Sequence, residues 1–377
     1  MMRLNDSKVM LALKGTDSFR HVEKDNFVIS LRSFEGGIEH SDYTGCVSPA
    51  YTVLKSNIDI KAQYFKYLFK SGPYISALQS STDSLRDGKS ISYDQFGAIP
   101  LPKLSIKEQE KIASFLDYET AKIDILIEKQ QRLIELLTEK RQAVISHAVT
   151  KGLNPDVPMK DSGVEWLGEV PEHWISAKLK YYTNQIVDGA HFTPTYTDSG
   201  VPFLRVSDIH GSTIDKSNIK YIPLREHKVL IKRCNPEKGD LLLSKNGTIG
   251  VPKVVDWDWD FSIFVSLCLI KFKPKLLSSY AEYFFKSYEI KEQINGLIKQ
   301  STVINLHLDK IQNFWFSIPP ISEQLEIIDY LNAQITKFDS LIDKAQTVIQ
   351  LMQERRTALI SAAVTGKIDV RDWVKPE

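Results

Sequence analysis

A stretch of 46 residues occurs twice in this chain of 377 residues. Residues 108–153 align without a gap with residues 323–368 at a constant offset of 215, and 20 of the 46 positions are identical. Amphipathic helices that merely share a composition do not match at so many positions, so the two copies form a true internal repeat. Two units are too few for a solenoid, which needs at least three. The arrangement therefore indicates one chain that imitates a twofold-symmetric pair.

Both copies have the pattern of a long amphipathic helix. Apolar residues recur about every 3.5 to 3.6 residues, and neither Gly nor Pro interrupts the stripe. Ser105 and Ser322 are the expected N-caps, and Gly152 and Gly366 follow the expected last turns. Each helix of about 44 residues would be roughly 65 Å long.

An apolar stripe of this length needs a partner, and the matching stripe of the other copy is the simplest one. Because a globular domain has to join the end of the first helix to the start of the second, we expect an antiparallel coiled coil with a local twofold axis. The alternative is that each helix lies on its own globular domain. The residues expected to face one another are Ile123, Leu126, Ile134 and Leu137 in the first copy and Phe338, Leu341, Ile349 and Met352 in the second.

The chain therefore has the expected class α+β, with two mixed α/β domains that alternate with two long helices. The expected segments are a first mixed domain (1–102), a first helix (103–152), a second mixed domain (153–320) and a second helix with a tail (321–377). The mixed domains also echo each other, since residues 25–30 resemble 239–244 and residues 67–71 resemble 283–287. Nothing in the first domain matches residues 174–238, so that domain is expected to lack its opening third or more.

Within the second mixed domain the pattern predicts a turn and buried strand at 238–244, a Gly-rich loop at 245–250, a strand at 265–272 and a helix at 278–299. The Gly247/Gly250 loop could cradle a phosphate through its backbone N–H groups, or it could be a plain hairpin turn. These predicted elements flank the polar loops of the second mixed domain.

The amino-acid composition restricts the classes of protein to which this chain can belong. The chain has 42% hydrophobic and 25% charged residues and a net charge of +1, which is ordinary for a globular protein. No apolar run approaches the roughly 18 residues of a membrane span, and no signal sequence is recognisable. The three scattered cysteines exclude a disulfide framework and favour a reducing cytoplasm. Between Val201 and Val255, ten Lys or Arg oppose five Asp or Glu, an excess of about +5 that a solvated face would also show.

Motifs for catalysis are absent from the sequence. It contains no phosphate-binding loop for ATP, no Gly-rich turn for a nucleotide-type cofactor and no clustering of its eight histidines at metal-ligand spacing. Asn154-Pro155 is followed by Asp rather than by the Pro-aromatic pair of amino-methyltransferases, and no Glu-x-Lys follows at nuclease spacing. We therefore expect a protein without catalytic or metal-binding residues.

Two polar loops of the second mixed domain carry residue types that read base edges. Arg and Lys suit guanine, Asn suits adenine, and Ser and Thr suit either. Each residue taken alone could equally be an ordinary turn or surface residue. The candidate DNA-binding residues are His191, Thr193, Arg205, Ser207, Lys245, Asn246 and Thr248.

The whole arrangement resembles the specificity subunits of type I restriction-modification enzymes. The resemblance rests on the two helices, on the P-L-P and I-P-P segments before them, on the pairs Glu108-Gln109 and Glu323-Gln324, and on the run from Lys160 to Trp174. The mixed domains would then be target-recognition domains, each reading one half of a split DNA sequence. The shortened first domain departs from this pattern and puts recognition of the first half-site in doubt.

The resemblance also implies partners and cofactors. The helices would act as a spacer that docks two methyltransferase (modification) subunits, which restriction/translocase subunits would join. S-adenosylmethionine, ATP and Mg²⁺ would belong to those subunits, and this chain would bind double-stranded DNA without catalysis. The other interpretations are a helical interaction scaffold without a DNA role, a free-standing enzyme such as a nuclease, and a partial recombination-cassette copy of a specificity subunit without independent recognition.

Overall fold

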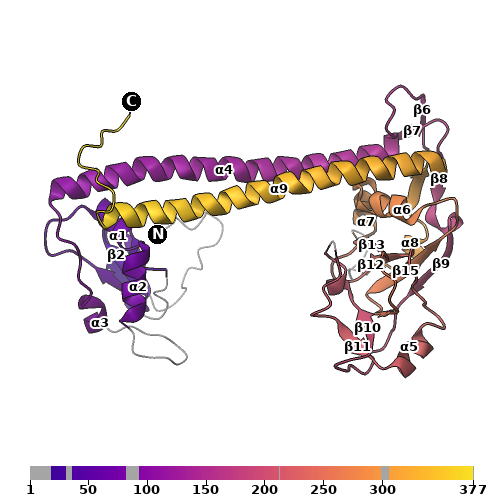
Figure 1. Cartoon of the computed structure of the whole chain (residues 1–377), viewed down its shortest axis with the longest axis horizontal. Helices are drawn as coiled ribbons and strands as arrows, with labels where there is room; N and C mark the ends of the chain where they lie inside the picture. Colours follow the sequence, from indigo (N-terminus) through magenta and orange to yellow (C-terminus); the bar gives the residue numbers. More distant parts are fainter. Residues whose placement is uncertain (1–17, 31–35, 82–92, 212, 299–304, 377) are drawn as a thin grey trace. The chain divides into compact units, whose positions relative to one another are not determined.

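The computed structural model describes residues 18–30, 36–81, 93–211, 213–298 and 305–376 (Figure 1). The chain divides into two compact units: unit 1 is Met1–Ile134 with Lys344–Glu377, and unit 2 is Glu135–Asp343. Each unit combines part of both long helices with a globular α/β portion, so the predicted α+β class is confirmed.

The globular portion of unit 1 is a small antiparallel β structure covered by short helices. Its strands pair as β1–β4 and in the order β3-β2-β5. Phe27 and Ile29 of β2 are buried against α1 and α2 in one core that also reaches the long helices. The elements are β1 (Arg20–Val22), β2 (Phe27–Ser30), β3 (Glu39–His40), β4 (Gly45–Val47), β5 (Tyr51–Leu54), α1 (Ala62–Leu68), α2 (Gly72–Ser80) and α3 (Tyr93–Gly97).

Unit 2 contains a larger α/β portion built on four sheets, ordered β13-β12-β15-β9, β11-β10-β14, β16-β8 and β6-β7. Its strands are β6 (Met159–Asp161), β7 (Glu169–Pro171), β8 (Ile175–Lys178), β9 (Thr183–Asp188), β10 (Val201–Leu204), β11 (Lys220–Ile222), β12 (Leu241–Ser244), β13 (Pro252–Val254), β14 (Ser262–Ile263), β15 (Leu267–Phe272) and β16 (Trp315–Ile318). Its short helices are η2 (Leu179–Tyr181), η3 (Val206–Asp208), α5 (Leu224–Leu230), α6 (Ser278–Lys286), α7 (Tyr288–Ile298) and α8 (Leu308–Ile311). The central strands β12 and β15 are fully buried at most positions because both faces of their sheet are covered.

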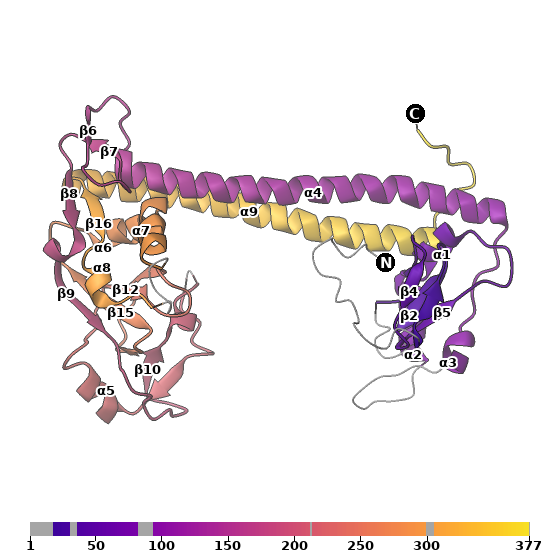
Figure 2. The ribbon, with the colours of Figure 1, turned by 180° about the vertical axis from the view of Figure 1, so that it is seen from behind.

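The long helices α4 (Ile106–Lys151) and α9 (Ile321–Val364) pack against each other within each unit (Figure 2). In unit 2, Arg141 near the end of α4 forms an ion pair with Asp339 of α9. In unit 1, Arg356 near the end of α9 forms an ion pair with Asp124 of α4, with 2.8 Å between Nε and Oδ1. In both units the end of one helix thus lies beside the earlier part of the other, which is the predicted antiparallel direction.

These two ion pairs occupy equivalent positions of the repeat, because both the aspartates and the arginines are 215 residues apart. Each therefore fixes the same antiparallel register in its own unit. The side chains are more than a third exposed, so each pair contributes only about 0.2–1 kcal/mol. The ion pairs select the register, and burial of the apolar stripe supplies most of the stability.

The buried stripe differs from the predicted one at two positions. Ile123 and Phe338 are buried as expected, but Leu126 is 44% and Leu341 is 40% exposed. Their neighbours Ile127 and Ile342 are half-buried instead. A spacing of four and then three residues keeps a straight seam between paired helices, and this spacing leads from 123 to 127 and not to 126.

The ends of the helices confirm three of the four predicted caps. Ser105 and Glu108 form a capping box, in which the Glu108 N–H donates to Ser105 Oγ (3.3 Å) and the Ser105 N–H donates to Glu108 Oε2 (3.0 Å). Gly152 and Gly366 follow the helices with φ of 77° and 73°. The prediction for Ser322 was wrong, because α9 already begins at Ile321.

The predicted helix at 278–299 is two helices. The chain leaves the helical conformation at Ser287, which has φ −70° and ψ 163°, so α6 ends at Lys286 and α7 begins at Tyr288. The break lets the N–H of Tyr288 donate to Ser146 Oγ of α4 at 2.8 Å. The turn and buried strand predicted at 238–244 are present, with β12 as the strand, and the strand predicted at 265–272 corresponds to β15, which begins two residues later.

In unit 2 a joint of buried hydrogen bonds fastens the globular portion to the helices. The Tyr280 hydroxyl lies 2.9 Å from the carbonyl oxygens of Val149 and Ser317. Gln324 of α9 is fully buried, accepts from Leu277 N–H (2.9 Å) and donates to the carbonyls of Lys275 (3.0 Å) and Pro319 (2.9 Å). Gln324, from the Glu-Gln pair that the sequence analysis singled out, thus fastens the globular portion of unit 2 to α9.

Unit 1 builds the same joint from equivalent residues. The Tyr64 hydroxyl donates to the Val364 carbonyl (3.2 Å), and Gln109 accepts from Lys61 N–H (2.8 Å). The N–H of Gly72 donates to Ser361 Oγ (3.3 Å), as Tyr288 does to Ser146. Offsets of 215 in the helices and 216 in the globular portions relate every one of these contacts to its counterpart. The echo between the two mixed domains is therefore a repetition of structure.

Candidate nucleic-acid interface

The candidate interface of unit 2 is organised around Asp188, the last residue of β9. The Lys245 ammonium lies 2.8 Å from Asp188 Oδ1, and His191 Nε2 lies 3.3 Å from Asp188 Oδ2. Asp188 and Lys245 are both buried, whereas the His191 side chain is exposed. Lys245 is therefore not a free cation, because a buried ammonium needs a counter-charge and Asp188 supplies it.

The loop after β12, residues 245–250, is a tight turn that lies beside Asp188 and His191. The N–H of Gly250 donates to the Ser244 carbonyl (2.8 Å), and the N–H of Val251 donates to Ser244 Oγ (2.8 Å). Gly247 and Gly250 have φ of 73° and 80°, a region that favours glycine. The loop is thus a tight turn that exposes Thr248 at its tip.

Asn246 in the same loop has an incomplete set of hydrogen bonds. It is half-buried and forms an isolated antiparallel bridge with Asn305. The side-chain carbonyl oxygens of both asparagines are buried without a hydrogen-bond partner among the described residues. A buried acceptor without a donor is costly, so the described residues do not fully satisfy this pair of side chains.

Arg205 has a structural role within the neighbouring segment. Its Nε and Nη2 donate to the Asp208 carboxylate at 3.1 and 3.0 Å, and this pair closes the 3₁₀ turn η3. These hydrogen bonds raise the pKa of the guanidinium further above its ordinary value. Arg205 is therefore already occupied, while Ser207 beside it remains exposed and donates to Asp208.

The structure brings three predicted segments together. A Cβ added to Gly247 would lie 3.8 Å from Val206, which places the loop after β12 against η3. Asp188 joins the same loop to His191, and Thr193 follows as an exposed residue. The predicted residues that remain accessible are His191, Thr193, Ser207, Asn246 and Thr248.

Helix α5 carries basic residues that the sequence analysis counted but did not place in the site. Arg225 and Lys228 lie three residues apart in α5 and share one face, Lys232 follows in the turn after the helix, and all three are exposed. The N–H of Thr195 donates to Glu226 Oε2 (3.0 Å), which ties this helix to the loop that bears His191 and Thr193. The spacing of these cations was the signal that could have identified them.

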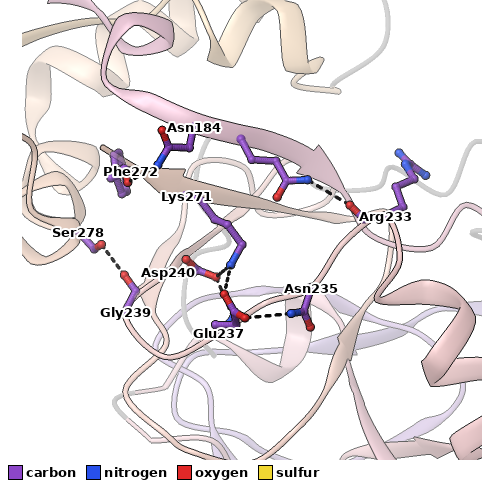
Figure 3. Close-up of polar contacts among 10 residues, drawn as sticks. Asn184, Arg233, Asn235, Glu237, Gly239, Asp240, Lys271, Phe272 and Ser278 are labelled. Atoms are coloured by element: carbon purple, nitrogen blue, oxygen red, sulfur yellow. Dashed lines mark hydrogen bonds and ion pairs between the residues drawn. The ribbon is translucent and has the colours of Figure 1, made fainter. Parts of the chain in front are cut away.

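The acidic side chains of the basic stretch, residues 201–255, already form hydrogen bonds or ion pairs for the most part. Lys271 Nζ lies 2.6 Å from Glu237 and 2.7 Å from Asp240. Figure 3 shows these three side chains gathered together. Burial raises the pKa of Asp240, although the hydrogen bond from Lys271 opposes the shift. By contrast, no ion pair within the described ranges engages the cations Lys220, Arg225, Lys228, Lys232 and Arg233. The excess of positive charge is therefore available at and around α5.

Within the part of the chain that the structure describes, no three His, Cys, Asp or Glu side chains are placed to hold a metal ion. None of its helices is long and apolar enough to cross a membrane. The site consists of exposed hydrogen-bonding loops beside a basic helix, which is the composition of a surface that binds nucleic acid.

This fold and site define a class of protein with recognition domains mounted on paired helices. Residues 188–350 match the profile of the family described as type I restriction modification DNA specificity domain. Residues 188–350 therefore form a domain of the type I restriction-modification specificity family, as the sequence resemblance predicted. The family is one of DNA-sequence recognition in restriction-modification systems.

Individual specificity subunits are also similar to this chain. The chain is 23% identical over 328 residues to the EcoKI specificity subunit of Escherichia coli K12, a match of 84% of this chain and 68% of that protein. It is 24% identical over 306 residues to the EcoBI specificity subunit of Escherichia coli, covering 78% of this chain and 64% of that protein. This chain therefore spans about two thirds of the length of these relatives.

Solved structures show the same fold. A chain from a study of complex assembly and conformational transition in a type I restriction-modification system superposes with a TM-score of 0.74 at 16% identity, covering 94% of this chain and 85% of that one. The HsdS subunit from Thermoanaerobacter tengcongensis superposes with a TM-score of 0.53 at 15% identity, covering 94% and 84%. These likenesses concern the fold alone.

Proposed function

We propose that this chain is the subunit that reads DNA sequence within a type I restriction-modification complex, with base readout by the accessible loops of unit 2. The observation that carries the proposal is the cluster at Asp188, which gathers His191 and the loop 245–248 on one surface beside the basic helix α5. Exposed Ser, Thr and His side chains and the half-buried Asn246 supply donors and acceptors for base edges.

Phosphate contacts are assigned to α5. Arg225 and Lys228 of α5 and Lys232 in the turn after it are exposed cations, and Glu226 ties α5 to the loop of His191 and Thr193. Contacts to phosphates fix the position of a protein on the duplex but carry no sequence information. The two kinds of contact therefore make separable contributions, one to affinity at all sequences and one to discrimination.

A bipartite target and docked partners complete the proposal. The repeated joint mounts one globular portion in each unit on equivalent helix residues, which suits a protein that reads two half-sites. Two methyltransferase subunits would dock on the helices, and restriction/translocase subunits would join them. The S-adenosylmethionine, ATP and Mg²⁺ of the reaction would be bound by those subunits, and this chain would be non-catalytic.

The test is to replace Asn246 in the complex with its methyltransferase partner. Asn246→Ala should relax discrimination at one base pair of the target by about 1–3 kcal/mol. The matched control is Asn184→Ala, because Asn184 is an exposed asparagine at the opposite end of strand β9 and donates only to the Phe272 carbonyl. Methylation mapping on a library of target sequences gives the recognition pattern, and the melting temperature shows whether the variant is folded.

The double variant Arg225→Ala with Lys228→Ala should weaken binding to all sequences alike and reduce the dependence of affinity on salt. An unchanged methylation pattern with Asn246→Ala at normal stability would remove this loop from base readout. Loss of stability without a change of pattern would mean that Asn246 serves only the turn.

A further inference from the structure

One phenylalanine of unit 2 has an unusual position. Phe192 is 54% exposed, and among the described residues it is the only phenylalanine that is exposed rather than buried or half-buried. Single exposed apolar residues are common on protein surfaces and need no explanation by themselves. Phe192 differs because it lies between His191 and Thr193, two accessible residues of the candidate interface.

The loop that carries Phe192 is fixed on both sides. On one side, Ala190 forms two backbone hydrogen bonds with the segment 263–265, at 2.8 and 2.9 Å. On the other side, Pro194 is buried, and the next residue donates its N–H to Glu226 Oε2 (3.0 Å). The three residues between these fixed points are therefore held on the surface by the fold.

The Phe192 ring has no aromatic or cationic neighbour within the described part of the chain. The ring contacts of this region join Tyr196 to Phe203, with centroids 6.3 Å apart, and Phe203 to Phe264, with centroids 6.0 Å apart. Tyr196, the other exposed aromatic residue of the loop, is thus already packed against the buried Phe203. The ring of Phe192 remains available for a ligand.

Positive charge beside the loop indicates that this ligand is nucleic acid. Glu226, which holds the loop, belongs to α5, and the exposed Arg225 and Lys228 belong to the same helix. No ion pair within the described ranges engages either of these cations. A duplex whose phosphates contact them would bring its base edges toward residues 191–193.

The chemistry of the ring restricts what it can recognise on a duplex. A phenylalanine side chain has no hydrogen-bond donor or acceptor, so it selects neither a phosphate nor the polar atoms of a base edge. The largest apolar group that a base presents in a groove is the 5-methyl group of thymine, which lies in the major groove. Phenylalanine is among the side chains suited to contact this methyl group.

We infer that Phe192 reads the 5-methyl group of a thymine in the half of the target that unit 2 contacts. It thereby adds an apolar determinant to the hydrogen-bonding side chains of His191 and Thr193. The inference rests on the proposed function and names one base that this surface selects. Burial of one methyl group against the ring should change a binding constant by about fourfold.

The test uses the full chain in complex with its methyltransferase partner and the recognition sequence found by methylation mapping. Each thymine of that sequence is replaced in turn by deoxyuridine, which pairs as thymine does but lacks the 5-methyl group. At one position the replacement should weaken binding to the wild-type complex by about fourfold. Phe192→Ala should bind the thymine and deoxyuridine duplexes equally at that position, whereas Phe192→Leu keeps an apolar side chain and should retain part of the preference.

The matched control is Tyr181→Ala. It removes another exposed ring of unit 2, which is 62% exposed and lies beyond the opposite end of β9, so the preference for thymine should be unchanged.

Two results would overturn the inference while unit 2 remains a reader of DNA. One is a preference that persists in Phe192→Ala or that the wild type shows at no thymine. The other is an equal loss of affinity for both duplexes in Phe192→Ala, which would indicate a ring inserted between base pairs. If the wild-type complex binds the recognition sequence and a scrambled duplex equally, the proposed function fails, and the inference fails with it.

Discussion

Replacing the buried amide of Gln324 with a carboxyl group is a sharp test of the joint in unit 2. The Gln324 amide nitrogen donates to two carbonyl oxygens, at 3.0 and 2.9 Å, and the side chain is fully buried. In Gln324→Glu an oxygen would face both carbonyls. A protonated carboxyl could still donate to one of them, so the variant would lose one hydrogen bond, worth about 1 kcal/mol.

The ionised form would cost far more, because two carbonyl oxygens and burial both disfavour the charge. A rise of about 3 units above the ordinary glutamate pKa of about 4.3 is within the range of buried carboxyls. The folded-state pKa would then exceed the unfolded one, so stability would be lost as the pH rises between the two values. The loss would grow by about 1.4 kcal/mol per pH unit, from about 1 kcal/mol near pH 4 to about 5 kcal/mol near pH 8.

Urea unfolding followed by tryptophan fluorescence measures this effect in unit 2, since Trp166, Trp174, Trp257, Trp259 and Trp315 all lie there. The difference between Gln324→Glu and the wild type should widen steadily from pH 5 to about pH 7 and then level off. Gln350→Glu makes the same change at an exposed position of the same helix and should alter stability by a few tenths of a kcal/mol at every pH. A difference that stays constant with pH would refute the proposed environment of Gln324.

Three further outcomes are expected. Cys46 is exposed whereas Cys234 and Cys268 are buried, and burial raises the pKa of the Cys234 thiol to about 12, so a thiol reagent should label one cysteine in the folded protein and three after denaturation; rapid labelling of all three would contradict this packing. Burial lowers the pKa of His227 below its ordinary 6.5, so the unfolded chain binds the proton more readily and stability should fall as the pH drops below about 6.5. The urea midpoint of His227→Gln should fall less over the same pH range, and an equal fall would show that His227 does not cause the loss of stability. Tyr280→Phe removes the hydroxyl between two buried carbonyl oxygens and should cost about 1–2 kcal/mol of unfolding free energy with an unchanged slope against urea, whereas no loss would show that the joint does not depend on it.

The long helices could be predicted from the sequence because their signal is local. A repeat spacing near 3.5 with no Pro or Gly specifies a paired helix whatever its surroundings, and the glycines at 152 and 366 mark its ends. The choice between adjacent apolar residues was harder. Leu126 and Ile127 both fit the stripe within one residue, and the partner helix in each unit decides which of them is buried.

The candidate interface was only partly predictable, because its geometry depends on residues far apart in the chain. Lys245 looks like a free cation in the sequence, but Asp188, 57 residues earlier, neutralises it in the folded unit. Arg205 forms an ion pair with Asp208, only three residues later. In the sequence this spacing fits a hydrogen-bonded turn as well as it fits a free base-reading arginine. The exposed residues of the same loops needed no long-range partner, and the structure leaves them accessible.

The repeated joint has a consequence for how such chains change over generations. The buried glutamines and the serines that accept a backbone N–H from the globular portions recur at both mounting positions on the helices. A gene segment encoding either portion could therefore be exchanged through the duplicated helix sequence without creating new misfits at the junction. Selection can thus act on the loops that contact a ligand while the mounting stays constant, so that a single crossover yields a folded protein with a different binding preference.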